Sequence, residues 1–342
     1  MTAARRLRVL VVDDSAFARK VLRETLSVSA DIEVVGVARD GLEALEKIAE
    51  LAPDVVTLDL IMPNLDGLGV LRALPAEGGP RVVIVSISDG DSALGIEALQ
   101  NGAVDLVQKP TALATDRLYE MSSELVAKVL SAGASHRRLV PPAQAPKPLP
   151  RIAGRVGLIV VGTSTGGPQA LTRLLTALPG DLPCPVAVAL HIPAGYTDAL
   201  AKRLDDACAL RVFEASEGAA LTAGSVVIAR GGINLRVRSG ARGLTTHLDP
   251  LRTASPFLPS VDVLFESAAV ALGPAVLGVV LTGMGSDGVE GARAIHRAQG
   301  RTLTEAESSC VVYGMPRAVV EADLSAGSAT IEDMAEMILQ RL

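Results

Sequence analysis

The stretch RVLVVDDSAFARKVLRETL, residues 8–26, contains the structural unit from which the whole chain is built. It opens with an apolar run that ends at two aspartates, Asp13 and Asp14. Apolar side chains then recur at helical spacing, which places Phe17 and Val21 on one face. An apolar strand followed by an amphipathic helix is typical of a parallel sheet that helices cover on both faces.

The same alternation continues as far as residue 108. Further apolar runs follow at IEVVGVA (32–38), DVVTLDL (54–60), RVVIVS (81–86) and VDLVQ (104–108). Residues 41–51 between two of these runs have helical periodicity. Five strands separated by helices predict a flavodoxin-like, doubly wound α/β domain.

The second half of the chain repeats this pattern. Buried strands are expected at 156–162, 186–190, 225–229 and 275–281, and helices at 168–178, 197–207, 260–272, 288–298 and 332–341. Residues 235–246, with Ser239-Gly240 as a two-residue turn, indicate an antiparallel hairpin. We therefore expect a second doubly wound, mainly parallel α/β domain that also carries a hairpin.

One change of composition separates the two halves. Residues 131–155 hold five of the 20 prolines and five Lys or Arg, with no acidic residue. Proline-rich segments favour extended conformations and do not pack a core. The sequence therefore predicts a domain over residues 6–125, a linker over 131–152 and a domain over 153–342.

Composition excludes several classes of function. The net charge of −6, four Phe, three Tyr and no Trp argue against a surface that binds nucleic acid by charge or base stacking. Three cysteines at unrelated spacings fit a reducing, cytoplasmic compartment, and the N-terminal run is too short for an export signal. The uncharged stretch 267–286 is broken by Gly273-Pro274, so we expect a helix end, a turn and a buried strand rather than a membrane span.

Charged and polar side chains follow the strands of the first half. They are Asp13 and Asp14 after the first strand, Asp59 after the third, Ser86 after the fourth and Lys109 after the fifth. Carboxyl ends of parallel strands share one edge, so these groups are expected to converge. Three carboxylates suit Mg²⁺, which prefers oxygen ligands. The alternative is a set of solvated loop residues, but all five lie at the correct strand ends.

These motifs, VVDDS, LDLIMPNLDG, VSIS and QKP, resemble the receiver domain of two-component response regulators. The resemblance implies that Asp59 accepts a phosphoryl group and that Asp13, Asp14 and Asp59 hold Mg²⁺. It also implies that Ser86 is the switch hydroxyl and that Lys109 precedes a cis proline. The chain departs from the family at Leu106, where receivers usually carry an aromatic residue.

The second half offers a candidate nucleophile. In GLIVVGTSTGGPQAL, Ser164 lies between a strand and a helix and is flanked by Gly162 and Gly166. This spacing fits a nucleophile elbow, a tight turn that presents a hydroxyl beside backbone N–H groups. The alternative is that Ser164 and Thr165 merely cap the helix that Pro168 opens.

A serine nucleophile needs a base, and the chain has four histidines. His191 directly follows an apolar strand, on the same sheet edge as Ser164. His136 lies in the predicted linker, His247 follows the hairpin and His296 lies among charged residues on a helix. The ordinary hydrolase order, Ser…Asp…His, would need His247 or His296.

The base in turn needs an orienting carboxylate. Asp287 in LTGMGSDG again follows a buried strand, and glycines in that loop allow the backbone at Met284 to approach the site closely. An ordinary loop aspartate is the alternative. Three strand ends would thus supply Ser164, His191 and Asp287.

With these residues identified, positions 153–342 resemble the catalytic domain of CheB-type chemotaxis protein-glutamate methylesterases. The matching segments are GTSTGGP, HIPAGYT, PFLPSVDVLFESAA, LTGMGSDGVEGA and VVYGMPRAV. The resemblance implies that Ser164 is the nucleophile, His191 the base and Asp287 its orienter. The backbone at Met284 and Thr165 would form the oxyanion hole. The departures are Arg230 and Asn234, where the family usually has Pro and His, and Leu258, where it usually has Arg.

The resemblance implies a cytoplasmic carboxylic-ester hydrolase that acts in chemotaxis adaptation. Its substrates would be glutamate γ-methyl esters, and also glutamines, on methyl-accepting chemoreceptors, which it would approach from outside the membrane. A chemotaxis histidine kinase would be the phosphodonor, Mg²⁺ would serve the receiver, and the ester reaction would need no cofactor. The alternatives are a receiver-controlled binding module without catalysis and an esterase for small soluble esters.

Overall fold

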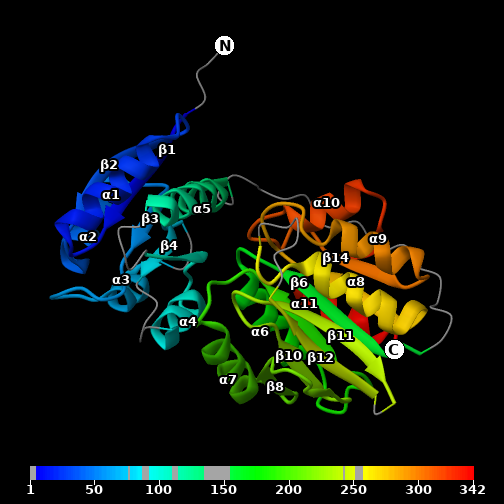
Figure 1. The fold of residues 1–342 in the computed structure, drawn as a ribbon. Helices are drawn as coiled ribbons and strands as arrows, with labels where there is room; N and C mark the ends of the chain where they lie inside the picture. The colour runs from blue at the N-terminus through cyan, green and yellow to red at the C-terminus, as the bar shows by residue number, and fades with distance from the viewer. Residues whose placement is uncertain are drawn as a thin grey trace. The chain divides into compact units, whose positions relative to one another are not determined.

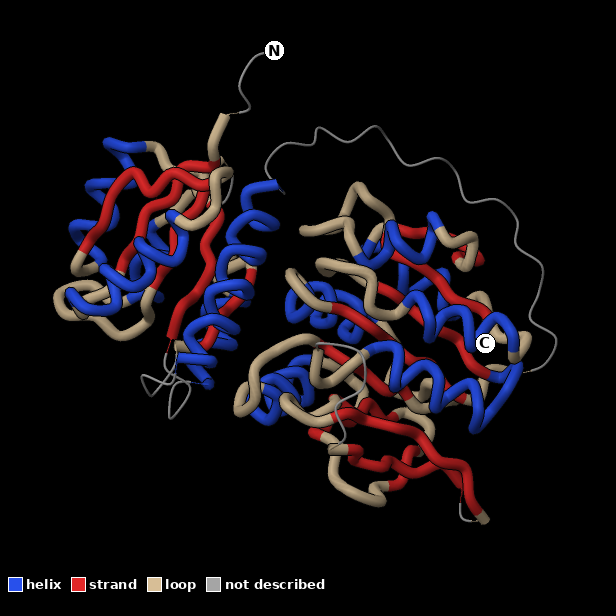
Figure 2. Tube along the Cα trace, turned by 45° about the horizontal axis from the view of Figure 1, so that its top comes forward, coloured by secondary structure: helices blue, strands red, loops and turns tan. Residues whose placement is uncertain are grey.

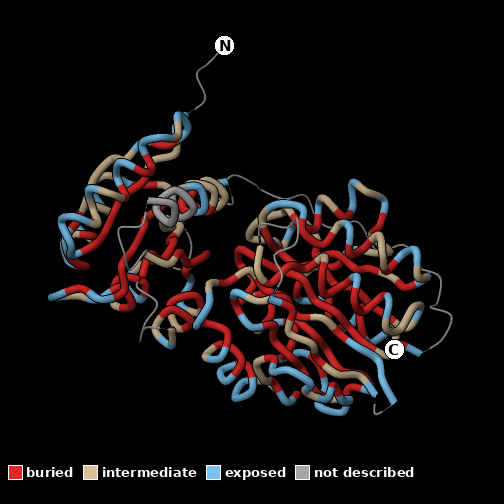
Figure 3. Tube along the Cα trace, viewed as in Figure 1, coloured by how far each residue is buried: buried red, intermediate tan, exposed pale blue. Residues whose placement is uncertain are grey.

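The computed structural model describes residues 5–75, 78–86, 92–109, 115–134, 155–241, 243–250 and 257–342, with no statement on the side chains of 115–122. The chain divides into two compact units, Met1–Leu139 and Val140–Leu342, and each is described by itself (Figure 1). In both units buried strands form the centre and helices cover them (Figures 2 and 3).

The first unit is a five-stranded parallel sheet in the order β2-β1-β3-β4-β5. The strands are β1 (Leu7–Val12), β2 (Ile32–Ala38), β3 (Val55–Leu58), β4 (Arg81–Ser86) and β5 (Asp105–Gln108), and the helices are α1 (Ala16–Ser27), α2 (Gly41–Leu51), α3 (Gly67–Ala73), α4 (Ser92–Gln100) and α5 (Thr115–Ala134). This order confirms the predicted flavodoxin-like topology. Its switch point lies between β1 and β3, the strands that precede Asp13 and Asp59.

Helix α5 corrects the predicted start of the linker. Residues 131–134, assigned to the linker as part of the proline-rich segment without acidic residues, form the last turn of this helix. Buried Leu125, Val129 and Ala132 continue one helical face into that turn. Small residues fit because the helix lies against β1: a Cβ at Gly133 would be 2.2 Å from Leu7. The rest of the predicted linker, residues 135–152, lies outside the described residues.

The second unit is a seven-stranded sheet in the order β15-β14-β13-β6-β7-β10-β8, and its strand pairs are parallel. The strands are β6 (Leu158–Thr163), β7 (Val186–Leu190), β8 (Arg211–Glu214), β10 (Ser225–Ile228), β13 (Val276–Val280), β14 (Arg301–Glu305) and β15 (Ser325–Ala329). From β6 the chain runs to β7 on one side and later to β13 on the other. The switch point therefore lies beside β6, and in open α/β sheets this is the position at which ligands bind.

Helices cover this sheet, and a small antiparallel sheet accompanies it. The helices are α6 (Gly167–Ala177), α7 (Thr197–Ala207), α8 (Val261–Leu272), α9 (Val289–Arg297), α10 (Met315–Glu321) and α11 (Ile331–Leu339), with a short 3-10 turn at Gly273–Ala275. The predicted break of the uncharged stretch into a helix end, a turn and a buried strand is confirmed. Within the described ranges, no helix has the length and apolarity that a membrane crossing requires.

The hairpin is present, but its turn is displaced. Strands β11 (Asn234–Gly240) and β12 (Gly243–Asp249) pair with each other, and β9 (Ala220–Leu221) pairs with β12. Ser239 pairs with Leu244, and Gly240 pairs with Gly243. The expected turn at Ser239-Gly240 is therefore wrong, because the strands continue through these small residues and Gly243, at φ 100°, supplies the left-handed conformation.

Candidate functional site

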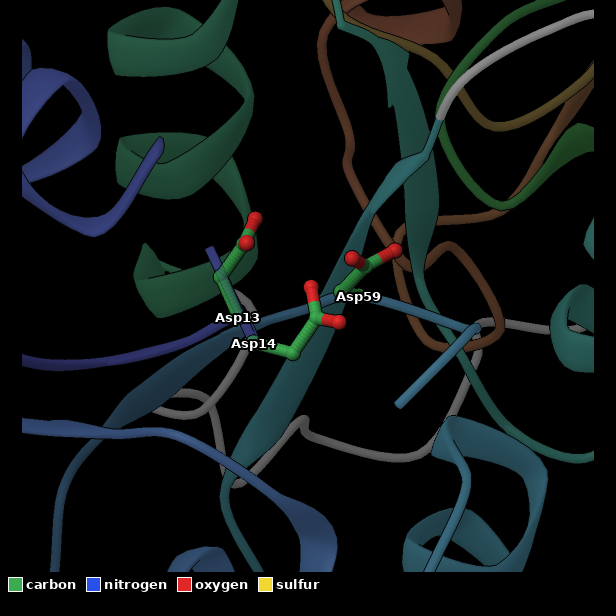
Figure 4. A group of neighbouring side chains, drawn as sticks. All are labelled: Asp13, Asp14 and Asp59. Atoms are coloured by element: carbon green, nitrogen blue, oxygen red, sulfur yellow. The ribbon is translucent and has the colours of Figure 1, made fainter. Parts of the chain in front are cut away.

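The predicted carboxylate cluster of the first unit is present. Asp13, Asp14 and Asp59 each offer an oxygen, and these atoms all lie within 4.8 Å of one another (Figure 4). The Lys109 ammonium lies 2.6 Å from Asp13 Oδ2 and 2.6 Å from Asp59 Oδ2. Ends of β1, β3 and β5 thus meet at one edge of the sheet, as the sequence predicted.

Burial is the largest influence on the pKa of Asp59. It raises the pKa of Asp59, while the ion pair with Lys109 opposes the shift and the nearby Asp13 carboxylate adds to it. Asp59 Oδ1 accepts a hydrogen bond from the Leu60 amide at 2.8 Å. The Ser86 hydroxyl is buried and has no hydrogen-bond partner among the described residues. A carboxylate and an unpartnered hydroxyl are therefore held at the same sheet edge.

In the second unit, Ser164 directly follows β6 in a tight turn that leads into α6. Its amide donates to the Thr282 carbonyl at 3.0 Å, and its own carbonyl accepts from the Gly167 amide at 2.7 Å. Gly166, at φ 79°, is the N-cap of α6 and provides no side-chain cap. The alternative that Ser164 or Thr165 is the N-cap is therefore wrong, and the Ser164 side chain is not used to start the helix.

His191 directly follows β7, and its amide donates to the Thr163 carbonyl at 3.1 Å. This bond places it beside the end of β6. Its ring Nε2 lies 2.8 Å from Asp287 Oδ2, and the ring stacks on Phe257 with centroids 4.2 Å apart. Nδ1 is buried and has no hydrogen-bond partner within the described part of the chain. The histidine ring is thus held by a carboxylate on one side and an aromatic face on the other.

Asp287 is held at the N-terminus of α8. Its Oδ1 accepts from the Ser260 hydroxyl at 2.9 Å and the Asp262 amide at 3.1 Å, and its Oδ2 accepts from the Val261 amide at 2.7 Å. Burial acts to raise the pKa of Asp287, but His191 and these backbone N–H groups outweigh it and hold the pKa below its usual value. Such donors at a helix N-terminus favour the charged carboxylate.

A second carboxylate supports the loop that carries Asp287. Asp262 Oδ1 accepts from the amides of Gly288 at 2.8 Å and Gly291 at 2.7 Å, at the start of α9. Asp287 therefore binds the N-terminus of α8, where Asp262 lies. Asp262 in turn binds the N-terminus of α9, which follows Asp287 in the chain. Burial raises the pKa of Asp262 to about 7, and the neighbouring Asp287 charge contributes to this shift.

The loop between β13 and α9 passes directly over Ser164. A Cβ at Gly283 would lie 2.9 Å from the Ser164 Cβ and 2.4 Å from Met315 Sδ, so only glycine permits this approach. The Gly283 carbonyl accepts from the amides of Gly314 and Met315. The backbone that leads into Met284 therefore lies beside the Ser164 turn.

The structure also describes two of the other three histidines and Asn234, one of the departures from the family pattern. His247 pairs with Glu217 at 2.9 Å on the hairpin sheet, and His296 is exposed on α9. His136 lies outside the described residues. Asn234 is fully buried, and its Oδ1 accepts from the Ser260 amide at 2.9 Å. It thus supports the start of α8, a role that the sequence, where Asn234 is only a departure from the family pattern, did not reveal.

Two family models match the chain. One, described as CheB methylesterase, matches residues 159–338, and the other, response regulator receiver domain, matches residues 9–121. The chain belongs to the CheB methylesterase family. Within this family it is 60% identical to protein-glutamate methylesterase/protein-glutamine glutaminase 5 of Myxococcus xanthus, over 99% of both chains.

Further relatives agree with this assignment. The chain is 40% identical to the protein-glutamate methylesterase/protein-glutamine glutaminase of Bacillus subtilis, over 97% of both chains. It also resembles the crystal structure of the Thermotoga maritima CheB methylesterase catalytic domain, with 33% identity and a TM-score of 0.53. That match covers 54% of this chain and 98% of the solved one. Family membership therefore rests on both halves of the chain.

Proposed function

We propose that this chain is a phosphorylation-regulated protein-glutamate methylesterase that removes methyl groups from glutamate side chains of chemoreceptors. The observation that carries the proposal is the His191–Asp287 pair beside the Ser164 turn, at the switch point of a parallel sheet. Full-length similarity to proteins named as methylesterases and glutaminases supports the same substrate groups. The substrate belongs to a membrane receptor, so the enzyme works beside the membrane, in the cytoplasm.

The reaction begins when His191 takes the proton of Ser164 and the serine Oγ attacks the γ-carbonyl carbon of the ester. Because Nε2 is engaged by Asp287, Nδ1 is the nitrogen that faces this proton transfer. The charged Asp287 stabilises the imidazolium that forms. Backbone N–H groups at Thr165 and Met284 bind the oxyanion.

The intermediate collapses when the C–O bond to the methyl group's oxygen breaks and His191 returns its proton to the departing methanol. Water, deprotonated by His191, then attacks the acyl-enzyme and releases the glutamate carboxylate and free Ser164. A glutamine substrate follows the same steps with ammonia as the leaving group. Every step uses side chains, backbone N–H groups and water.

The receiver unit supplies the regulation. Asp59 accepts a phosphoryl group from a chemotaxis histidine kinase, Lys109 offers the positive charge, and Ser86 offers a free hydroxyl. The donor set fits Mg²⁺, because one oxygen from each of the three carboxylates lies within 4.8 Å of the others. Asp13, Asp14 and Asp59 would hold the ion, which neutralises phosphoryl charge when bound.

The test measures methanol release from membranes that contain a methyl-labelled chemoreceptor. Ser164→Ala in the full chain should fold and lose about 10⁴–10⁶-fold in kcat, since the nucleophile is removed. A fluorophosphonate, which labels activated serines, should modify the wild type and not this variant. A binding module without catalysis predicts no labelling of either protein. An esterase for small soluble esters predicts turnover of such esters without any receptor present.

A further inference from the structure

Thr282 lies where β13 ends, one residue before the loop that passes over Ser164. It is 1% exposed. Its carbonyl accepts two hydrogen bonds, one from the Ser164 amide at 3.0 Å and one from the Thr163 hydroxyl at 2.7 Å. The peptide group that leads into the Gly283 loop is thus bound directly to the backbone of the serine turn.

The Thr282 hydroxyl joins a third segment to these two. It donates to the Thr165 carbonyl at 3.0 Å and accepts from the Val312 amide at 2.9 Å. Val312 is itself bound to the loop, since its carbonyl accepts from the Gly283 amide at 3.0 Å. A single buried hydroxyl therefore connects the residue after Ser164 to Val312, and Val312 in turn binds the Gly283 amide that precedes Met284.

Glu305, at the end of β14, completes the set of contacts. Its Oε2 accepts from the Thr282 amide at 2.8 Å, and its Oε1 accepts from the Ser309 hydroxyl at 2.8 Å. The carboxyl is buried, and burial raises its pKa. The amide, carbonyl and hydroxyl of Thr282 are thus all engaged, which leaves the residue a single orientation.

We propose that Thr282 is a positioning residue whose hydroxyl sets the spacing between the Thr165 and Met284 N–H groups that bind the oxyanion. This inference rests on the proposed function of Ser164. Oxyanion donors act only if they are oriented before the reaction, and small displacements remove much of their effect. A hydroxyl bonded to both flanking segments is a direct means of fixing that distance. Thr282 acts on the transition state and leaves substrate binding unaffected.

The experiment compares Thr282→Val, which has the same shape without the hydroxyl, with Thr282→Ser, which keeps it. The matched control is Thr302→Val in β14, because Thr302 is 1% exposed and its hydroxyl has no hydrogen-bond partner among the described residues. Full-length proteins are assayed by methanol release from methyl-labelled receptor membranes. We expect Thr282→Val to lose about 10²-fold in kcat with KM changed by less than about twofold. Thr282→Ser should retain kcat within about fivefold, and Thr302→Val should match wild type.

Two results would overturn the inference: a Thr282→Val variant with kcat within about threefold of wild type, or a Thr282→Ser variant as impaired as Thr282→Val. Thermal unfolding checks that each variant is folded, and Thr282→Ala, with the same expected loss, replaces Thr282→Val if that variant does not fold. The Ser164→Ala variant distinguishes failure of the role of Thr282 from failure of the proposed function. If Ser164→Ala is inactive and Thr282→Val is not impaired, only the role of Thr282 fails. If Ser164→Ala stays active, the proposed function fails.

Discussion

Asp59 and Asp287 occupy comparable places in the two units, yet their pKa values are displaced in opposite directions. Each follows a strand at the switch point of a parallel sheet, and each is buried. Burial raises the pKa of Asp59, and the adjacent Asp13 carboxylate adds to the shift. For Asp287 the effect of burial is outweighed by His191 and by amides at the start of α8, which lower the pKa.

The comparison shows that the sheet determines where a carboxylate lies, whereas its neighbours determine what it can do. Asp59 shares its edge with two other carboxylates and with one ammonium, so it is suited to a cation and a phosphoryl group. Asp287 is surrounded by N–H and O–H donors, so it remains charged beside a histidine.

Replacing the base should have the largest effect. His191→Gln removes the group that moves the serine proton and should lower kcat by about 10⁴–10⁶-fold. His247→Gln and His296→Gln are the controls, because these rings lie on the hairpin sheet and on the exposed face of α9. Methanol release from labelled receptor is the measurement. Activity that depended on His296 instead would contradict the order Ser164, His191, Asp287.

Removing the charge of Asp287 should have an effect nearly as large. Asp287→Asn leaves the imidazolium without its carboxylate and turns an amide group toward N–H donors, so kcat should fall by about 10⁴-fold. KM should change little, because Asp287 faces His191 and α8 and lies 3% exposed. Steady-state kinetics on receptor membranes separate the two constants. A large rise in KM with kcat retained would indicate that Asp287 binds substrate.

Removing the Asp59 carboxylate should affect regulation only. With a small-molecule phosphodonor and Mg²⁺, wild-type activity should rise about tenfold, which corresponds to about 1.4 kcal/mol. Asp59→Asn should keep basal activity and lose this response. A fragment that begins at Arg151 should exceed the unphosphorylated full chain if the receiver restrains the esterase. A response that persisted in Asp59→Asn would place the phosphoryl group elsewhere.

The sequence predicted the strand-end groups of both units but not the residues that hold them. Asp59, Ser164 and Asp287 follow apolar runs, and parallel sheets bring such ends together. Ser260 and Thr282 look ordinary in the sequence, because their roles depend on contacts between segments far apart in the chain. Ser260 reaches across 27 positions to Asp287, and Thr282 reaches across 117 positions to Thr165. A single sequence carries no signal for such pairs.

Two strands that sequence reasoning missed, β14 and β15, share a physical cause. Strand β15 reads SAGSA and has no apolar run, and β14 reads RTLTE with polar residues at three of its four buried positions. The sheet accepts Thr304 because hydroxyls of β15 satisfy its own: Thr304 Oγ1 lies 2.8 Å from the Ser325 hydroxyl and 2.6 Å from that of Ser328. Strands built on such pairs are recognised only from the fold.

The smallest effect concerns stability, where the two carboxylates should differ in sign. A carboxyl with a raised folded pKa is penalised for ionising, so Asp59 should reduce stability as pH rises from its ordinary value of 3.8 through its folded pKa. Asp287, with a lowered pKa, should stabilise the fold above 3.8 and lose that contribution as pH falls further. At neutral pH, Asp59→Asn should therefore stabilise the receiver unit and Asp287→Asn should destabilise the esterase unit.

Thermal unfolding of the full chain at several pH values measures both effects. A gain of about 1 kcal/mol would raise the Tm of a receiver-sized unit by about 4–8 °C. Asp31→Asn is the matched control, because Asp31 is an exposed carboxylate in the same unit and outside the acidic cluster. If Asp59→Asn lowered the Tm at neutral pH, the ion pair with Lys109 would outweigh burial and repulsion from Asp13. Both ionised carboxylates would then stabilise the fold, and the two sites would differ only in the groups that surround the carboxylate.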